Sequence, residues 1–563
     1  MDTFYEPLLQ LETFVQAGEK LAGNEGLLLL TGCVESQKTH LMYSLGRGWQ
    51  VKLILTYSEL KAKEIYEEYE ALGEEAFYYP AKDFLFFHAD IQGNELLKQR
   101  MTAVSRLLSG KAAVIVTTLD GCMDPLLPFE KLKELVLTIG TGSILEMEAV
   151  KRRLVRMGYE RVGQAELPGQ FAIRGGILDI YPLTEEYPVR IELWDEEVDS
   201  IRSFDAESQR SMENLEEIVL YPAAELNPGE YHMDGVSLLD YVGRYRSLVF
   251  LDEVNRLYER GETVEKEYRQ NYENRMEKGQ IMQGQQEEIF PCEQVMYWLS
   301  RMRGAALGTL ETTDKRMDFY IRFRLETRSV QSYHNHFELL VKDLKRWKKE
   351  QYRIVLMCAS RTRGKRLAEE LLAEELAAFY SEDEKRVVQP GEIMVVHGNV
   401  FRGYEYPMIR FAVISETDVF GREKKKRRRK QRTYEGRKIG SFTDLSIGDY
   451  VVHENHGLGI YRGIEKITVD KTVKDYMKIE YSRGACLYIL ATQLDLIQKY
   501  GGADAAKVPR LNTLGGQDWK KTRSKVKGAV QEVAKDLVEL YAARQSEKGY
   551  VYGPDTVWQK EFE

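Results

Sequence analysis

The chain has 563 residues, of which 43% are hydrophobic and 30% charged, and its formal net charge at pH 7 is −9. A chain of this length is too long for one hydrophobic core, so several globular domains are expected. It has no run of eighteen apolar residues, and its N-terminus lacks the basic and apolar regions of a signal peptide, so neither a transmembrane helix nor export is expected and a cytoplasmic protein is predicted. The five cysteines form no CxxC pair, which favours reduced thiols over disulfides or a zinc site.

The first 127 residues alternate apolar runs with charged stretches of helical period. The runs GLLLLTG (26–32), VKLILTYS (51–58) and AAVIVTTLDG (112–121) are typical of buried strands. Alternation of such strands with helices predicts a parallel sheet covered on both faces.

Residues 128–222 change to short, alternating runs separated by Gly and Pro, such as FAIRGGILDIYP (171–182) and YPVRIELWDEEVDSIRSFD (187–205). This pattern predicts a small antiparallel β-rich domain. The α/β pattern returns over 223–330 with RSLVFLDEVNRLYE (246–259). We therefore interpret the β-rich segment as an insertion into the first domain.

Four further segments follow. Residues 331–421 predict a small α/β domain from the strands RIVLMCAS (353–360), GEIMVVHG (391–398) and MIRFAVISETDVFG (408–421). Residues 422–444 are a basic linker, in which positions 422–438 carry eleven Lys and Arg against two Glu. Residues 445–502 alternate like a small β-barrel. Residues 503–563 predict a long amphipathic helix from the spacing of Trp519, Val526, Val530, Val533, Leu537, Leu540 and Tyr541.

The first strand leads into an altered phosphate-binding loop. The motif G-x-x-x-x-G-K-[ST] lies between a strand and a helix, and residues 32–39, which begin at Gly32, read GCVESQKT in that context. Lys38 is placed to reach phosphates and Thr39 to ligate Mg²⁺, but Gln37 stands where the motif has Gly. A Cβ there crowds the turn around the phosphates, and Glu35 adds negative charge where phosphate would sit. The loop is predicted to be degenerate, with weak or no nucleotide binding.

The strand LVFLDE (248–253) ends in a second half of a nucleotide site. Such an acidic pair, here Asp252 and Glu253, can hold Mg²⁺ and orient an attacking water. The alternative is a retained element of the fold, in which the two acids only cap a strand end. We favour this second interpretation and expect no ATP hydrolysis by these residues.

Four segments carry a family resemblance. They are YPAKDFLFFHAD (79–90), GYERV with GQFAIRGGILDIYP (158–182), SIRSFDAESQRS (200–211) and GDYVVHENHGLGIYRGI (448–464). The chain resembles the helicase UvrB, and more closely the N-terminal, non-motor half of bacterial transcription-repair coupling factor (Mfd). UvrB has a long aromatic hairpin after its Tyr-Pro segment, whereas residues 84–101 here run on without room for one. The resemblance implies a multidomain α/β fold with a degenerate P-loop (RecA/helicase-like) domain, a β-rich insertion, a further small α/β domain, a CarD/Tudor-like β-barrel and a long C-terminal helix.

The resemblance implies that the β-rich insertion binds UvrA. Arg161 and Arg174 match arginines that UvrB uses for this contact, a neighbouring UvrB arginine is replaced by Ala172, and Phe171 would add an aromatic anchor. The alternative is that Arg174 pairs with an acid on its own sheet, either Asp179 or Glu192.

The barrel resembles the domain that binds the β subunit of RNA polymerase, and Ile467 matches an apolar interface position. His453 and His456 have no third ligand nearby, so they favour a turn over a metal site, and no metal or other cofactor is expected in this chain.

The family's motor, an ATP- and Mg²⁺-dependent translocase on double-stranded DNA, would follow Glu563. On that interpretation the chain has been shortened or its gene is incomplete, and it is not active alone. The basic run is expected to be a solvated linker, with contact to DNA phosphates as the alternative. The resemblance implies a monomeric adaptor that joins stalled polymerase to UvrA in nucleotide excision repair. Two alternatives remain open: a UvrB-like ATP-dependent DNA enzyme and a CarD-like transcription regulator.

Overall fold

The computed structural model describes most of the chain up to residue 420 and a smaller part beyond it. The described residues are 2–82, 94–206, 208–224, 234–277, 289–311, 316–333, 336–383, 385–398, 400–420, 437–438, 448–453, 457–469, 472–490, 497–499 and 511–512. They fall into two units, residues 1–88 with 94–430 and residues 89–93 with 431–563, each described here by itself. Among the described residues, no helix combines the length and apolar character that a membrane crossing requires.

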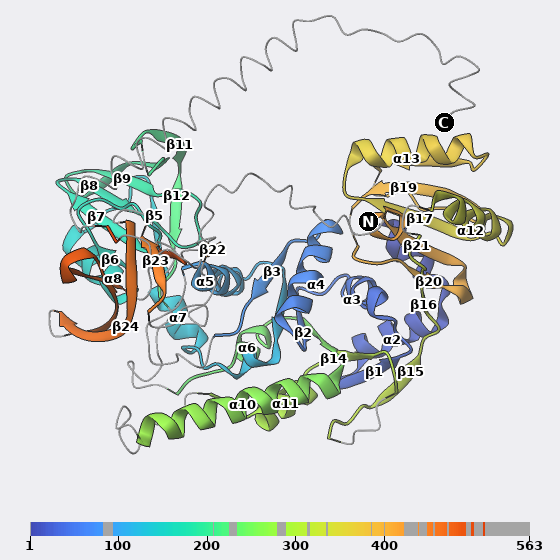
Figure 1. Cartoon of the computed structure of the whole chain (residues 1–563), viewed down its shortest axis with the longest axis horizontal. Coiled ribbons are helices and arrows are strands. Elements are labelled where there is room, and N and C mark those ends of the chain that lie inside the picture. The colour runs from blue at the N-terminus through green and yellow to red at the C-terminus, as the bar shows by residue number, and fades with distance from the viewer. Residues whose placement is uncertain are drawn as a thin grey trace, which may run out of the picture. The chain divides into compact units, whose positions relative to one another are not determined.

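The first sheet has seven parallel strands in the order β15-β1-β14-β13-β2-β4-β3. Their bounds are β1 (Leu27–Thr31), β2 (Val51–Thr56), β3 (Ala76–Tyr79), β4 (Ala113–Thr118), β13 (Ser247–Asp252), β14 (Gly304–Gly308) and β15 (Ile321–Arg324). Strands β13 and β14 lie between β1 and β2, so the sheet is built from two stretches of chain. Figure 1 shows the two stretches as blue strands beside green ones. The predicted parallel α/β sheet is confirmed.

Both faces of this sheet are buried. Successive residues of β1 enter different cores: Leu28 and Leu30 belong to one cluster, Leu27 and Leu29 to the other. This explains why the strands are continuous apolar runs. The surrounding helices are α1 (Asp2–Tyr5), α2 (Glu12–Gly23), α3 (Lys38–Leu45), α4 (Glu59–Ala71), α5 (Asn94–Leu108), α6 (Leu119–Met123), α9 (Leu238–Val242), α10 (Val254–Glu277) and α11 (Cys292–Arg301).

The inserted segment forms a six-stranded sheet in the order β11-β10-β9-β8-β7-β6, and β5 pairs with β12 beside it. The bounds are β5 (Leu137–Gly140), β6 (Glu160–Arg161), β7 (Gln170–Arg174), β8 (Ile177–Ile180), β9 (Val189–Trp194), β10 (Glu197–Phe204), β11 (Ser211–Leu215) and β12 (Glu217–Leu220), with α7 (Phe129–Leu135) and α8 (Met147–Arg156). The β-rich prediction is confirmed, except that β6 pairs with β7 in parallel. One face of the sheet is apolar, and α8 packs against it through Val150 and Leu154.

The second α/β sheet has the order β16-β20-β21-β17-β19-β18, with parallel pairs around β17 and antiparallel pairs at β20. Its elements are β16 (Arg328–Ser329), α12 (Phe337–Lys349), β17 (Arg353–Cys358), α13 (Arg361–Ala373), β18 (Ala378–Ser381), β19 (Ile393–His397), β20 (Tyr404–Tyr406), β21 (Phe411–Ser415) and α14 (Glu416–Phe420). One face of this sheet shares a core with the first sheet, because Val355, Met394 and Phe411 belong to the same cluster as Leu28 and Ile54. The first and second α/β sheets with their helices, called the first and second α/β units below, both belong to the first of the two units named above. They are packed together through this shared core, which the sequence pattern did not predict.

The second unit contains an antiparallel sheet in the order β22-β27-β23-β24-β25-β26. Its strands are β22 (Arg437–Lys438), β23 (Tyr450–His453), β24 (Gly457–Val469), β25 (Thr472–Glu480), β26 (Cys486–Leu490) and β27 (Ile497–Lys499). Within the described ranges, β22 and β26 are the two ends of this order, so a closed barrel stays a prediction. The predicted helix around 519–541 and most of the linker at 422–444 lie outside the described residues, as do positions 83–93, where the absence of a hairpin was inferred.

Candidate functional site

The altered phosphate loop lies at the carboxyl edge of the first sheet, where ligands bind in open α/β folds. Gly32 follows β1 with φ 77°, and a Cβ on it would come within 2.1 Å of the carbonyl oxygen of Leu325. Glycine is retained there because the neighbouring backbone leaves no room for a side chain. The chain then makes a short 3₁₀ turn, Glu35–Gln37, that leads directly into α3.

Lys38 is surrounded by carboxylates of its own chain. Its Nζ lies 2.8 Å from Glu35 Oε2, 2.7 Å from Asp252 Oδ1 and 2.6 Å from Glu253 Oε1. The lysine side chain is 1% exposed. All three donors of the ammonium group thus have anionic acceptors within hydrogen-bonding distance.

The three carboxylates are held in turn by other residues. Thr56 at the end of β2 donates to Asp252 Oδ2 at 2.8 Å. Glu253 has a positive φ of 55°, unusual for a residue with a side chain, and its Oε1 accepts from the N–H and hydroxyl of Thr309 at 2.9 and 2.7 Å. Lys61 Nζ lies 3.1 Å from Glu35 Oε1. The sequence did not indicate Thr56 or Thr309, although Thr56 ends the buried strand β2 and Thr309 follows the buried strand β14.

The electrostatics of the cluster favour a charged Lys38. Burial disfavours the ammonium form, but Asp252, Glu35 and Glu253 outweigh it and hold the pKa of Lys38 above its usual value. Burial opposes ionisation of Glu253 as well, yet Lys38 and Thr309 keep the pKa of Glu253 below its usual value. Burial raises the pKa of Asp252 against the opposing effect of Lys38.

Mg²⁺-ATP does not fit this arrangement. The oxygens of Glu35, Asp252 and Glu253 lie within 4.8 Å of one another, as a metal site would need, but Lys38 already bridges these residues. Thr39, the expected Mg²⁺ ligand, is 3% exposed and its side chain hydrogen-bonds to Glu68. The Glu35 carboxylate lies 2.8 Å from Lys38 within the loop itself, so it occupies the lysine where a phosphate would otherwise pair with it.

Gln37 does not strain the loop as a Cβ at that position was expected to do. Its backbone has ordinary right-handed angles, φ −97° and ψ −19°, because the chain turns into α3 instead of wrapping around phosphates. The side chain is fully buried, and its Nε2 donates to the hydroxyl of Tyr406 at 2.6 Å. That hydroxyl also lies 2.9 Å from Nδ1 of His40. No sequence motif indicated Tyr406, which comes from the second α/β sheet.

We expect His40 to remain neutral well into the acidic range. Burial lowers the pKa of His40 to about 4, while its hydrogen bond to the carbonyl of Phe4 acts in the opposite direction. The folded-state pKa lies below the ordinary value, so this group contributes stability above pH ~6.5 that is lost as the pH falls towards 4, up to about 3 kcal/mol. NMR titration of the His40 ring, assigned with a His40→Gln variant, measures this pKa. An apparent value near the ordinary one would contradict the prediction.

The inserted sheet has one charged face. Asp179 on β8, 1% exposed, accepts from Arg174 at 2.5 Å and from Arg190 Nε at 2.7 Å. The pairing of Arg174 with Asp179, foreseen as the alternative to a partner contact, is therefore present. Even so, the side chain of Arg174 is 48% exposed, so its guanidinium remains accessible to a partner.

Of the two other residues expected on this surface, Phe171 is buried and Arg161 is exposed. Phe171 is fully buried in the core of the inserted domain, so the expectation that it anchors a partner is wrong for this surface. The reason is strand alternation, which directs Phe171 and Arg174 to opposite faces of β7. Arg161 is exposed on the edge strand β6 and is in register with Phe171, while Ala172 is buried beside Asp179.

The sheet of the second unit contains the other predicted positions. Ile467 lies on β24 opposite Lys474, and its side chain is outside the described residues. His453, on β23, is buried, whereas His456 is outside the described residues. Among the described residues, Glu35, Asp252 and Glu253 are grouped closely enough to hold a metal ion, and His453 does not belong to that group.

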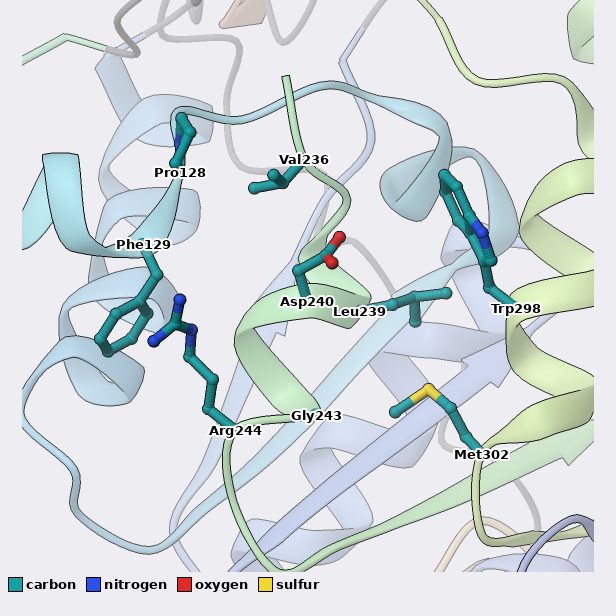
Figure 2. A pocket seen from close by; sticks show the side chains of 9 residues that line it. All are labelled: Pro128, Phe129, Val236, Leu239, Asp240, Gly243, Arg244, Trp298 and Met302. Carbon is teal, nitrogen blue, oxygen red and sulfur yellow. The ribbon is translucent and has the colours of Figure 1, made fainter. Parts of the chain in front are cut away.

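A cavity of about 510 Å³ lies elsewhere in the first unit (Figure 2). Arg244 reaches across its rim, where its guanidinium carbon stands 4.4 Å from the ring centre of Phe129 and it pairs with Glu130. Asp240 accepts a hydrogen bond from the N–H of Ser237. Both charged groups at the rim have partners within the protein, and neither was indicated by the sequence.

Comparison with known proteins identifies two domain families and a group of relatives. Residues 137–226 match the UvrB interaction domain, and residues 445–501 match the CarD-like/TRCF RID domain. The chain is 32% identical to the transcription-repair-coupling factor of Bacillus subtilis (strain 168), over 98% of this chain and 52% of that protein. The factor of Staphylococcus epidermidis is 30% identical over 87% of this chain and 46% of its own length, and that of Staphylococcus aureus is 28% identical over 95% and 50%. The chain thus spans about half the length of these curated relatives.

Among solved structures, a DEAD box protein from Methanococcus jannaschii aligns over 74% of this chain at 10% identity. The alignment covers 92% of that protein, with a TM-score of 0.23.

Proposed function

Because the chain is homologous to transcription-repair-coupling factors over 98% of its length, we propose that it is the adaptor part of such a factor. In this role it binds the β subunit of RNA polymerase and recruits UvrA, and so links stalled transcription to nucleotide excision repair. ATP hydrolysis and translocation on double-stranded DNA are expected of the remaining half of the relatives' length.

One observation carries this proposal: a UvrB interaction domain and a CarD-like/TRCF RID domain occur in one chain. The UvrB interaction domain alone would suit a UvrB-like enzyme, and the CarD-like/TRCF RID domain alone would suit a CarD-like regulator. A protein that holds both is suited to bringing two partners together. The cluster around Lys38 supports an adaptor over an ATP-dependent enzyme, because the lysine that would bind phosphate is engaged by three carboxylates.

The direct experiment is co-purification with both partners in the absence of nucleotide. The 563-residue chain is expected to bring down UvrA and the polymerase β subunit together, and also each one separately. Binding of only one partner would reduce the proposal to a single-partner module. A requirement for Mg²⁺-ATP would contradict it.

Replacing Arg174 with alanine is expected to weaken UvrA binding about tenfold, because arginine is enriched among the few interface residues that carry most of the binding energy. Biolayer interferometry with purified UvrA measures the affinity. Arg152→Ala is the matched control: Arg152 is an exposed arginine on α8, the helix that packs against the opposite face of the inserted sheet. Binding to polymerase should be unchanged in both variants. If both variants bound UvrA with equal affinity, the contact would have to lie away from Arg174.

Replacing Ile467 with arginine is expected to weaken binding to the polymerase β subunit at least tenfold, because it places a charge in an apolar contact. The neighbouring Thr468→Arg introduces the same charge one residue further along β24 and serves as the control. Binding to an immobilised β-subunit fragment is the measurement. Unchanged affinity for Ile467→Arg would place the interface elsewhere on this sheet.

A further inference from the structure

The altered phosphate loop contacts the second α/β unit along residues 400–406. Ser36 Oγ donates to the carbonyl of Gly403 at 3.0 Å. The carboxylate of Glu68 on α4, which also holds Thr39, accepts from the N–H of Phe401 at 2.9 Å. Polar side chains of the loop and its flanking helix thus bond to backbone groups of the other unit.

The position of the proton on His40 fixes the direction of the hydrogen bonds through Tyr406. His40 Nε2 lies 2.8 Å from the carbonyl oxygen of Phe4, which can only accept, so Nε2 carries the proton of the neutral ring. Nδ1 is then an acceptor, and the Tyr406 hydroxyl donates to it at 2.9 Å. Because its proton is used there, the Tyr406 oxygen can only accept from Gln37, whose Nε2 donates at 2.6 Å.

This chain of bonds gives a chemical reason for glutamine at position 37. The buried Tyr406 oxygen can still accept a hydrogen bond, and a side-chain N–H at position 37 supplies it, which glycine lacks and glutamate would not provide when ionised. The aromatic rings add to the contact, since His40 stacks on Tyr404 with ring centres 5.1 Å apart. The surrounding apolar core is shared by both sheets.

We propose that residues 36–40 and 400–406 form a permanently closed joint, in which the altered phosphate loop binds the second α/β unit directly in place of a nucleotide. Gln37 is its positioning residue. Lys38 closes the other side of the loop by joining α3 to the end of β13. In this joint the two α/β units move as one body, with or without nucleotide, and this goes beyond the proposed adaptor function.

Hydrogen exchange of the 563-residue chain tests the joint. Tyr406→Phe removes two hydrogen bonds, so exchange in peptides covering 33–40 and 400–406 is expected to rise about tenfold. Exchange in the central strand β17 should stay the same. Gln37→Met, which keeps the size but not the donor, should raise exchange in the same two peptides. In the double variant, the rise in exchange should stay close to that of the more affected single variant and well below the product of the two single rises. The reason is that both changes remove the same hydrogen bond.

Tyr333→Phe is the matched control. Tyr333 is equally buried, but its hydroxyl bonds to Asp343 within the second α/β unit, so exchange at the joint should not change. A titration of the unmodified chain with Mg²⁺-ATP should leave both joint peptides unaltered. The proposal would be overturned if Tyr406→Phe exchanged like the unmodified chain, or if Mg²⁺-ATP protected residues 33–40.

Discussion

Lys38→Met is expected to lower the free energy of unfolding of the first α/β unit by about 3 to 5 kcal/mol, the usual cost of removing one partner from a buried ion pair. Methionine retains most of the packing volume but leaves Glu35, Asp252 and Glu253 facing one another without the shared ammonium group. Asp252 is fully buried and cannot be solvated instead. Hydrogen exchange in peptides of β1 and β13 reports this loss, since both strands end at the cluster.

The pH dependence of this variant has a defined sign. Without Lys38, burial and mutual repulsion raise the folded-state pKa values of the carboxylates above their unfolded values. Groups with raised pKa values destabilise the fold as the pH rises through the acidic range, so the deficit of the variant should be larger at neutral pH than in acid. Lys61→Met is the control, because Lys61 pairs with the partly exposed Glu35 and Glu64, so its removal should cost clearly less than that of Lys38. Equal stability of Lys38→Met and the unmodified chain would show that the cluster is not an ion-paired core.

Arg100→Met is expected to lower the free energy of unfolding by up to about 3 kcal/mol, because Asp124 loses one partner of a buried ion pair but keeps Lys82, 3.0 Å away. Arg100 on α5 and Asp124 form an ion pair whose side chains are both fully buried. The guanidinium group also donates to the carbonyl of Pro80 at 2.6 Å and lies 4.1 Å from the ring centre of Tyr79. These contacts hold the start of the Tyr-Pro segment against the first sheet, and the variant removes all of them together.

Chemical denaturation and exchange in peptides around β3 and β4 measure the effect. Arg106→Met on the same helix is the control, because Arg106 pairs with the exposed Glu75 and its loss should cost about 1 kcal/mol or less. If the two variants were equally stable, the buried pair would not be needed to hold this segment.

Local sequence patterns are enough to predict several elements of this fold. The apolar runs at β1, β2, β4, β13 and β17 were predicted because a strand buried on both faces needs apolar residues at nearly every position. The same local patterns located the β-rich insertion, Lys38 beside an altered loop, and the acidic pair at the end of β13. The resemblance, which rests on longer motifs, indicated the transcription-repair coupling factor family.

Strand β14 shows where local patterns fail. Its residues, GAALG, have little strand propensity. Gly304 is required because a Cβ there would come within 2.2 Å of the carbonyl oxygen of Val249 on the neighbouring strand. That requirement comes from the packing of two strands and leaves no periodic signal. Phe171 is a similar case. The motif match predicted its strand, but only the pairing of that strand within the sheet decides that Phe171 faces the core and not a partner.

The contacts of the altered loop depend on residues that the fold brings together from distant parts of the sequence. Lys38 meets Asp252 across 214 positions of the sequence, and Gln37 meets Tyr406 across 369. The sequence could show that Gln37 departs from the phosphate-loop motif, but not that a tyrosine from the second α/β unit needs its N–H group. Hydrogen bonds and ion pairs between distant residues depend on how the sheets pack, and that packing is set by a shared core that no single segment encodes.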